Sequence, residues 1–143
     1  MNHHGFTLLE LLFAMLIAAL LICCFSPASK DVQHKKLFVM RQQIQAALSH
    51  ARQLALIKQQ PMQLEAFNNG DWSSGMRLVN QQGKLIYQWR WASPSITVQW
   101  YGTQPYIRFH PDIRHAMCNG HFRLQQGSMV DESIHMNRVG KVT

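Results

Sequence analysis

Hydrophobic and polar residues follow three different patterns along the 143-residue chain. Residues 6–25 form a nearly unbroken apolar run that is interrupted by one acid, Glu10. Between residues 30 and 60 the apolar residues recur at three- and four-residue steps, and from residue 62 onward the period changes to two. These patterns predict an apolar helix, then an amphipathic helix, then a series of β-strands.

The apolar run has the length of a membrane anchor, because about twenty apolar residues can span a bilayer as a helix. An ordinary secretory signal is cleaved after its apolar region, behind small residues. Here the break between polar and apolar sequence comes before the run, at Gly5-Phe6, after a five-residue polar leader. The sequence therefore predicts an apolar helix that stays in the chain.

Glu10 is the only carboxylate of the apolar run. A charge in hydrocarbon is costly, and such residues usually serve a function with a partner nearby. The alternative is that Glu10 lies near the membrane interface and extends its side chain to water.

The amphipathic segment has one apolar face. The residues of this face are Leu37, Met40, Ile44, Ala47, Leu48, Ala51 and Ala55. Pro61 predicts that the helix ends near Gln59 or Gln60. A helix running from Phe6 to Gln59 would be roughly 80 Å long. Pro27 would kink it or melt it locally, because proline removes one helix hydrogen bond.

The alternating pattern predicts seven short strands separated by turn residues. The expected strands are Met62–Phe67, Met76–Asn80, Leu85–Trp91, Ile96–Trp100, Tyr106–His110, His121–Gln125 and Ser133–Met136. Antiparallel strands that cover the apolar face of the second helix give a small α+β domain. The strand from Leu85 to Trp91 carries Tyr87, Trp89 and Trp91 on one face. This aromatic face is expected to pack in the core, and the alternative is an exposed binding platform.

The charge balance favours an anionic partner, since the chain has fourteen Lys and Arg against seven Asp and Glu. All fourteen basic residues lie from Lys30 onward. A basic surface could contact phosphates of DNA or simply aid solubility. The basic residues near the C-terminus that could serve DNA are Arg108, Arg114, Arg123, Arg138 and Lys141.

The cysteines and histidines give only weak indications of a disulfide or a metal site. Cys23 and Cys24 lie in the apolar run, so Cys118 is alone in the expected domain and is either buried or paired between chains. The ligand types of His110, His115, Cys118 and His121 suit zinc, but their spacing matches no familiar finger and no metal or other cofactor is expected. The sequence shows no phosphate loop, no catalytic carboxylate pair and no Ser-His-Asp spacing, so an enzyme has little support.

The N-terminal segment Gly5-Phe6-Thr7-Leu8-Leu9-Glu10 resembles the prepilin signature of type IV pilins and type II secretion pseudopilins. The resemblance implies that a membrane peptidase cuts after Gly5 and methylates Phe6, and that the apolar helix later packs in a filament core. The new amine at Phe6 of one subunit could then pair with Glu10 of the next. Many pilins also carry a proline where this chain has Pro27.

Two further segments resemble GspH/FimT-type minor pilins. His50–Ala55 is similar to their A-R-x-x-A segment, and Asp71–Met76 is similar to their W-x-x-G hairpin. Phe109 at a strand end and the terminal residues 137–143 also fit. The FimT branch ends in a G-R-x-R motif that is associated with DNA binding. The aligned residues here are Gly140, Lys141, Val142 and Thr143, so one Arg is replaced by Lys and the other is absent.

Together the residues and the resemblance predict a pilin-like α+β protein, a minor pilin or pseudopilin at the filament tip or in assembly initiation. We expect a leader at residues 1–5, a transmembrane helix at 6–29 and a soluble domain at 30–143. The expected location is the inner membrane, single-pass, with the domain in the periplasm, and then the filament. The expected partners are other pilins, the prepilin peptidase and the inner-membrane assembly platform.

Two alternatives stay open at this point. One is a DNA receptor for natural transformation that uses Arg138, Lys141 and Arg123. The other is an unprocessed monotopic membrane protein whose basic domain binds an acidic cytoplasmic partner. The sequence does not separate a type IV pilus from a type II secretion pseudopilus.

Overall fold

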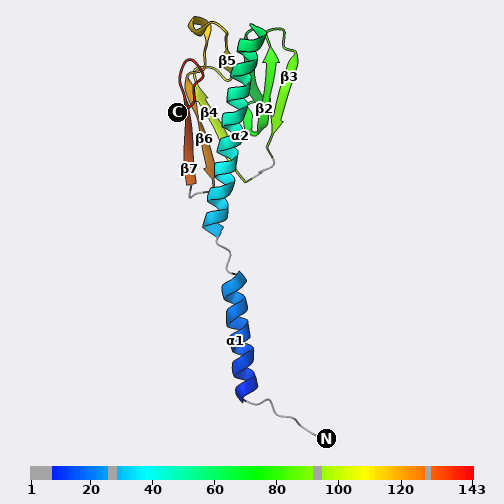
Figure 1. The fold of residues 1–143 in the computed structure, drawn as a ribbon, viewed down its shortest axis with the longest axis vertical. Helices are drawn as coiled ribbons and strands as arrows, with labels where there is room; N and C mark the ends of the chain where they lie inside the picture. Colours follow the sequence, from blue (N-terminus) through cyan, green and yellow to red (C-terminus); the bar gives the residue numbers. More distant parts are fainter. Residues whose placement is uncertain (1–7, 26–28, 92–94, 128–129) are drawn as a thin grey trace. The chain divides into compact units, whose positions relative to one another are not determined.

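The computed structural model describes residues 8–25, 29–91, 95–127 and 130–143 (Figure 1). The chain divides into two compact units, Met1–Val32 and Gln33–Thr143. The predicted leader, the predicted cleavage site at Gly5-Phe6 and the proline at position 27 all lie outside the described residues. Cleavage and the kink at Pro27 therefore stay predictions.

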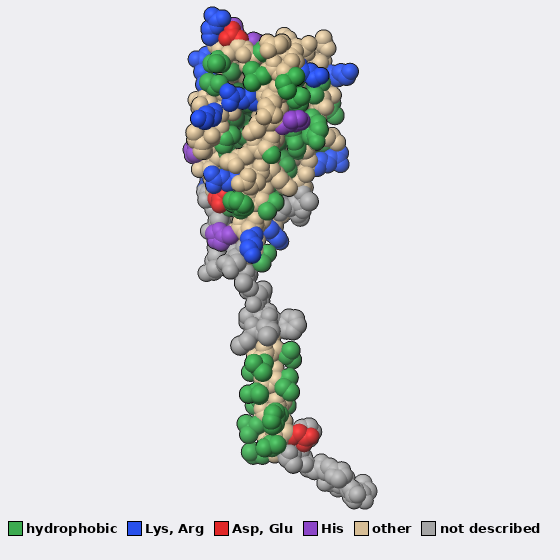
Figure 2. Space-filling view, viewed as in Figure 1, with side chains coloured by type: hydrophobic (Ala, Val, Ile, Leu, Met, Phe, Trp, Pro, Cys, Tyr) green, Lys and Arg blue, Asp and Glu red, His purple; other side chains and the backbone are tan. Residues whose placement is uncertain are grey.

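The first helix, α1 (Leu8–Phe25), consists almost entirely of apolar residues. Its residues from Leu8 to Leu21 are all exposed in the isolated chain, and Leu8 is 80% exposed. Figure 2 shows hydrophobic side chains on the visible sides of this helix. In the described part of the chain, no helix reaches the combination of length and hydropathy that a membrane span requires.

The second helix, α2 (Ser29–Lys58), confirms the predicted amphipathic segment. Every residue of the predicted apolar face, from Leu37 to Ala55, is buried. The helix ends in a Schellman motif, in which Gln60 N–H donates to the Ala55 carbonyl and Gln59 N–H donates to the Leu56 carbonyl, both at 3.3 Å. Gln59 takes the left-handed conformation that this motif needs, with φ of 51°. Pro61 follows and cannot continue the helix.

All seven predicted strands are present. Their bounds are β1 (Met62–Asn68), β2 (Asp71–Asn80), β3 (Leu85–Arg90), β4 (Thr97–Gly102), β5 (Ile107–Phe109), β6 (Gly120–Gln126) and β7 (Val130–Met136). They form two antiparallel sheets, one in the order β3-β2-β1-β5 and one in the order β4-β6-β7. A short 3₁₀ helix, η1 (Ile113–His115), lies between β5 and β6. The predicted α+β class is confirmed.

One hydrophobic core joins α2 to the inner faces of both sheets (Figure 1). Its largest fully buried side chains include Phe109, Phe122, Leu48, Ile44, Leu64 and Leu78. Each such side chain stabilises the fold by about 2 kcal/mol relative to exposure to water. Side chains alternate along a strand, so the residues between these buried positions point to the outer face of each sheet. The outer faces of the two sheets are therefore open to solvent or partners, and so is the exposed side of α2, which carries Phe38, Val39 and Ile57.

Strand β2 begins at Asp71, five residues before the predicted start at Met76. The predicted strand starts too late because Ser73, Ser74 and Gly75 have low strand propensity. Ser73 bonds to the other sheet, where its Oγ accepts from Val98 N–H at 2.9 Å, and Trp72 is buried in the core. These tertiary contacts stabilise the extended backbone of this segment, which is the segment similar to the W-x-x-G hairpin.

Gly75 has a specific role where β2 meets β3. Its φ is +139°, and a Cβ at this position would lie 2.2 Å from the carbonyl oxygen of Trp89. The two strands approach so closely because Gly75 pairs with Arg90 in the antiparallel register. Only glycine satisfies both the backbone angle and the close approach.

Candidate functional site

The predicted assembly residue Glu10 lies in the first turn of α1, and it is the one acid of this helix. Negative charge is favourable at a helix N-terminus, where the macrodipole is positive. Its predicted partner, the amine at Phe6, and the cleavage position Gly5 lie outside the described residues. The roles of these three residues therefore stay predictions.

The structure places the three DNA-binding candidates on different surfaces. Arg138 lines a hollow with Arg108 and Arg114, whereas Lys141 lines a second hollow with Arg52 from α2. Arg123 lies on the outward face of β6, directly opposite Gln99 of β4 and Ser133 of β7. The three candidates do not form one continuous site.

A compact turn fixes the C-terminal segment that holds two of these candidates. The Oδ1 atom of Asn137 accepts from Val139 N–H at 3.1 Å and from Lys141 N–H at 2.9 Å. Gly140 packs on Phe109, and a Cβ at this glycine would lie 2.8 Å from the Phe109 ring. The segment similar to the family's terminal motif is thus held against the core at Phe109.

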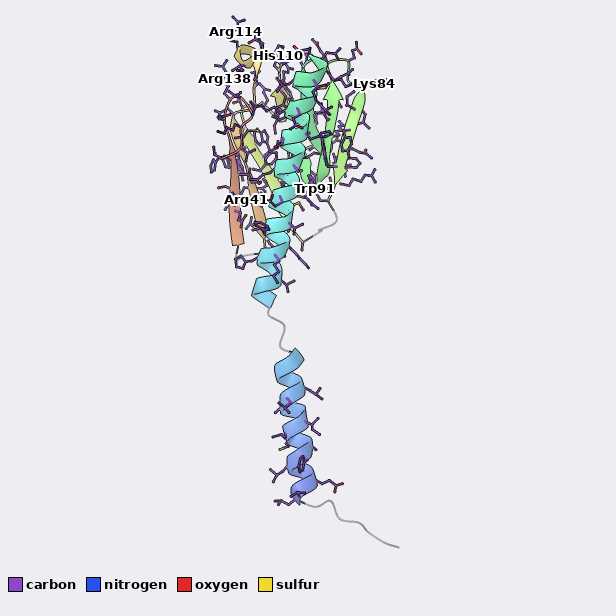
Figure 3. The ribbon with its side chains drawn as sticks, in the orientation of Figure 1. Arg41, Lys84, Trp91, His110, Arg114 and Arg138 are labelled. Atoms are coloured by element: carbon purple, nitrogen blue, oxygen red, sulfur yellow. The ribbon has the colours of Figure 1, made fainter. Side chains whose placement is uncertain are left out.

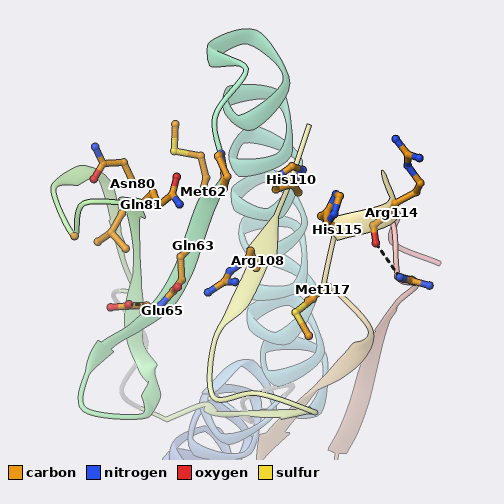
Figure 4. A pocket seen from close by; sticks show the side chains of 14 residues that line it. Met62, Gln63, Glu65, Asn80, Gln81, Arg108, His110, Arg114, His115 and Met117 are labelled. Atoms are coloured by element: carbon orange, nitrogen blue, oxygen red, sulfur yellow. Dashed lines mark hydrogen bonds between the residues drawn. The ribbon is translucent and has the colours of Figure 1, made fainter. Parts of the chain in front are cut away.

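A hollow of the domain lies next to the residues that follow the end of α2, Pro61 and Met62, and we call it the basic hollow. Its volume is about 630 Å³. Its floor is a row of side chains that the register places next to one another on the outer face of the four-stranded sheet (Figure 4). This row consists of Val79, Gln63, Arg108 and Met117. Arg108 points outward because Ile107 and Phe109 on either side of it are buried in the core.

Positively charged and titratable side chains form one wall of the basic hollow. They are His110, Arg114, His115 and Arg138. Figure 3 shows Arg114, His110 and Arg138 at the same end of the domain, away from Arg41 and Trp91. Arg138 Nη2 donates to the Arg114 carbonyl at 2.9 Å, the bond that is dashed in Figure 4. The opposite rim comes from the β2–β3 turn, with Asn80, Gln81 and Gly83.

Asp112 contacts two side chains of this wall, Arg114 and His115. Its carboxylate accepts from the Arg114 side chain, with Nη2 at 3.1 Å and Nε at 3.2 Å, and also from Arg114 N–H at 3.0 Å. These hydrogen bonds from Arg114 hold the pKa of Asp112 below its usual value. His115 Nδ1 lies 3.4 Å from the same carboxylate. The charge of Arg114 is therefore matched by an acid of its own chain.

The other two arginines of the basic hollow, Arg108 and Arg138, have no carboxylate partner of this kind. Glu65, which also lines the hollow, is paired with Arg77 at 2.9 Å across β1 and β2. Arg108 contacts the hydroxyl and ring of Tyr106, and Arg138 contacts a backbone carbonyl. Among the described residues, neither Arg108 nor Arg138 forms an ion pair with a carboxylate.

The four residues with zinc-ligand chemistry do not converge. Cys118 is buried and its thiol donates to the Arg108 carbonyl at 3.1 Å. His121 instead stacks between Tyr101 and His135 on the outer face of the second sheet, with ring centroids 5.0 and 5.2 Å apart. Only His110 and His115 are neighbours, at 5.1 Å. Within the described ranges, no group of three or more His, Cys, Asp or Glu residues could hold a metal ion.

The aromatic strand face is partly core and partly surface. Trp89 and Trp91 pack against the core, and Trp91 Nε1 donates to the Trp72 carbonyl at 3.0 Å. Tyr87 is 48% exposed, but its ring packs edge-on against His50 of α2 at 5.1 Å. The interpretation as core packing is right for the two tryptophans and incomplete for Tyr87, because β3 is the edge strand of its sheet.

The sequence analysis grouped Arg108, Arg114 and Arg138 with Arg123 and Lys141 as basic residues near the C-terminus, and it did not separate these three from the other two. Residues 63, 79 and 117, which complete the floor, carried no signal in the sequence. Their placement depends on strand register, since β1 pairs with β2 in a hairpin and with β5 across a long sequence separation.

Comparison with known proteins identifies two family models along the chain. The model described as "Type II transport protein GspH" matches residues 41–140, and the "Prokaryotic N-terminal methylation motif" matches residues 1–22. No curated protein sequence matches significantly.

Two solved structures of the type IV minor pilin FimU from Pseudomonas aeruginosa are similar in fold. The first, in space group P21, has a TM-score of 0.66 and 14% identity, covering 78% of this chain and 89% of FimU. The second, in space group P65, has a TM-score of 0.57 and 16% identity, covering 71% and 86%. At these identities the likeness shows the fold alone.

Proposed function

The chain belongs to the type II transport protein GspH family, and from this premise we propose that it acts at the tip of a filament and takes part in initiating assembly. It is a minor pilin or pseudopilin of the type IV pilus and type II secretion class, a structural protein that carries the methylation motif of prepilin processing. FimU, which has a similar fold, is a type IV minor pilin, and this supports the role of a minor subunit of the filament.

The proposal rests on one observation: the chain joins a pilin domain to α1, an apolar helix that contains a single acid. Its leucines and Phe13 are uncovered in the isolated chain. In water this surface is unstable, so it requires a cover of lipid or of neighbouring helices. The methylation motif implies anchoring in the inner membrane, followed by assembly into a filament whose other pilins supply that cover.

The finer steps belong to the same proposal. The prepilin peptidase cleaves after Gly5 and methylates Phe6, residues 1–5 are the leader, and residues 6–29 anchor the chain as a single pass. Residues 30–143 then form a periplasmic domain. Glu10 pairs with the amine at Phe6 of the next subunit, and this pairing satisfies both charges in an apolar core. The assembly platform of the inner membrane takes up the processed subunit.

Immunogold labelling of filaments tests the proposal with three forms of the chain. Wild type should be found at one end of the filament. Glu10→Ala should be inserted and cleaved but lose at least nine-tenths of its filament label, because the amine of its neighbour is left without a counter-charge in the apolar core. Gly5→Val should stay uncleaved, since a side chain blocks close approach to the backbone. Label along the whole filament, or normal label with Glu10→Ala, would contradict the proposal.

A further inference from the structure

The outward side of α2 carries two pairs of exposed apolar residues. Phe38 and Val39 are 57% and 52% exposed, and Leu56 and Ile57 are 43% and 77% exposed. Each residue of the second pair follows its counterpart by eighteen positions, which is five full helical turns, so both pairs lie on the same side of the helix. Along the helix axis the pairs are about 27 Å apart.

The line between the two pairs has no charged residue. Its exposed residues recur at steps of three and four, and they are Gln42, Ala46, Ser49 and Gln53. The opposite side of the helix is buried in the core, and α2 lies in front of both sheets in Figure 1. We call the two apolar pairs and the line between them the outward strip. Exposed apolar residues that are grouped in this way mark interaction surfaces.

Basic residues flank the outward strip at both ends. Lys35 and Lys36 precede the first apolar pair and Lys58 follows the second, and all three are exposed. The whole of α2 has six Lys and Arg against one acid, Asp31. A basic helix with exposed apolar residues is typical of membrane-surface contacts. The flanking charges therefore favour an anionic lipid surface over the uncharged side of another protein helix.

Chain length keeps a membrane within reach of this helix. α2 begins at Ser29, four positions after α1 ends at Phe25. The ten residues from Phe25 to Lys35 span at most about 35 Å. A membrane that holds α1 is therefore always near the outward strip, and such a tethered contact gains from a high effective concentration.

We propose that the outward strip of α2 rests on the anionic surface of the inner membrane before the subunit enters the filament. The two apolar pairs enter the boundary between headgroups and acyl chains, and Lys35, Lys36 and Lys58 contact lipid phosphates. The inference rests on the proposed function, because the anchored state supplies the membrane. It gives α2 a lipid contact that ends when the subunit leaves the bilayer.

Photo-cross-linking in vesicles tests this contact. The full chain carries p-benzoyl-phenylalanine in place of Phe38 or Ile57 and is anchored in vesicles of equal parts phosphatidylglycerol and phosphatidylcholine. Both positions are exposed, so the new side chain leaves the core intact. We expect lipid adducts at both positions, mapped by mass spectrometry. Gln88 is the matched control, because it is exposed on the outer face of β3, opposite Arg77 in the register, and the same group there should give at most a tenth of the adduct.

Two changes test the part that charge plays. Vesicles of phosphatidylcholine alone should give about tenfold less adduct at positions 38 and 57, because they lack the anionic lipid that attracts lysine. Lys35→Gln together with Lys36→Gln should lower the adduct in the mixed vesicles about fivefold. Arg90→Gln removes a charge from exposed β3 and should leave the adduct unchanged.

The contrary outcomes are distinct. If the chain does not float with the vesicles, the anchoring in the proposed function fails and this inference falls with it. If the chain floats but positions 38 and 57 give no more lipid adduct than position 88, the inference alone is wrong. Adducts to a second protein copy in place of lipid would assign the outward strip to a contact between subunits. Equal adducts in both kinds of vesicle would contradict the role of the lysines.

Discussion

At the scale of single residues, Cys118 shows how burial in the core makes a thiol unreactive. The sequence left it either buried or paired between chains, and the structure buries it completely. Its thiol donates to the Arg108 carbonyl, so the side chain helps to hold the strand that carries the floor of the basic hollow. Burial raises the pKa of the thiol from 9.0 to about 12. A neutral, inaccessible thiol has no role as a nucleophile at physiological pH.

The raised pKa of Cys118 predicts a loss of stability in alkali. The unfolded chain ionises this thiol above pH 9.0, whereas the folded domain keeps it protonated up to about pH 12. Stability is therefore fully present below pH 9.0 and decreases as pH rises toward 12. From pH 8 to 10, the unfolding free energy of the fragment Gln33–Thr143 should fall about 1 kcal/mol more than that of its Cys118→Ala variant. Parallel pH profiles, from urea unfolding, would refute this.

At the scale of elements, tertiary contacts extend β2 beyond the residues whose local sequence favours a strand. Residues Ser73, Ser74 and Gly75 have poor strand propensity, and yet they lie in the first half of β2. The Ser73–Val98 hydrogen bond joins the two sheets at this segment, and Trp72 fills the core beneath it. Gly75 then allows β3 to pair closely. The similarity to the W-x-x-G pattern thus has a physical basis in this chain.

Gly75→Ala should destabilise the domain by about 3 kcal/mol, because the new Cβ meets the Trp89 carbonyl and the backbone angle disfavours alanine. Gly83→Ala is the matched control, since its φ is +76° but nothing lies within 4 Å of the added Cβ. The control should cost only about 1 kcal/mol. Denaturant unfolding of Gln33–Thr143 measures both, and equal losses would show that the close approach to β3 has no energetic weight.

At the scale of the whole molecule, the positive charge is divided among separate surfaces. Arg138 faces the basic hollow, Lys141 faces a hollow beside Arg52, and Arg123 lies on the outer face of β6. DNA binding gains affinity from several phosphates contacted together on one surface. The arrangement therefore gives DNA capture less support than the sequence alone did.

We expect the fragment Gln33–Thr143 to bind DNA weakly or undetectably at physiological salt. Any binding should fall steeply with salt and should be equal for unrelated sequences, because phosphate contacts release counterions and carry no sequence information. Fluorescence anisotropy with a labelled duplex, at 50 and 150 mM salt, measures this. Tight, salt-resistant binding that Arg138→Gln with Lys141→Gln abolishes would make DNA capture the primary function.

The sequence by itself determined the order and type of the elements. Local periodicity sufficed for α2, whose buried face from Leu37 to Ala55 was predicted in full, and for the existence of all seven strands. The Gly5-Phe6 break and Glu10 predicted the prepilin class, because a charge in an apolar run is a local signal that needs no fold to be seen. The family match across residues 41–140 agrees with this class.

Only the tertiary structure decided the division into two sheets and the grouping of the basic side chains. Gln63 lies opposite Val79 within the β1–β2 hairpin, and the register also sets it opposite Arg108 of β5, which is far away in the chain. That pairing depends on which faces pack on α2, a property of the whole core that no local pattern contains. The same packing determined that Arg108 and Arg138 share one hollow while Lys141 and Arg123 lie elsewhere, because each side chain follows its strand or turn to a different face.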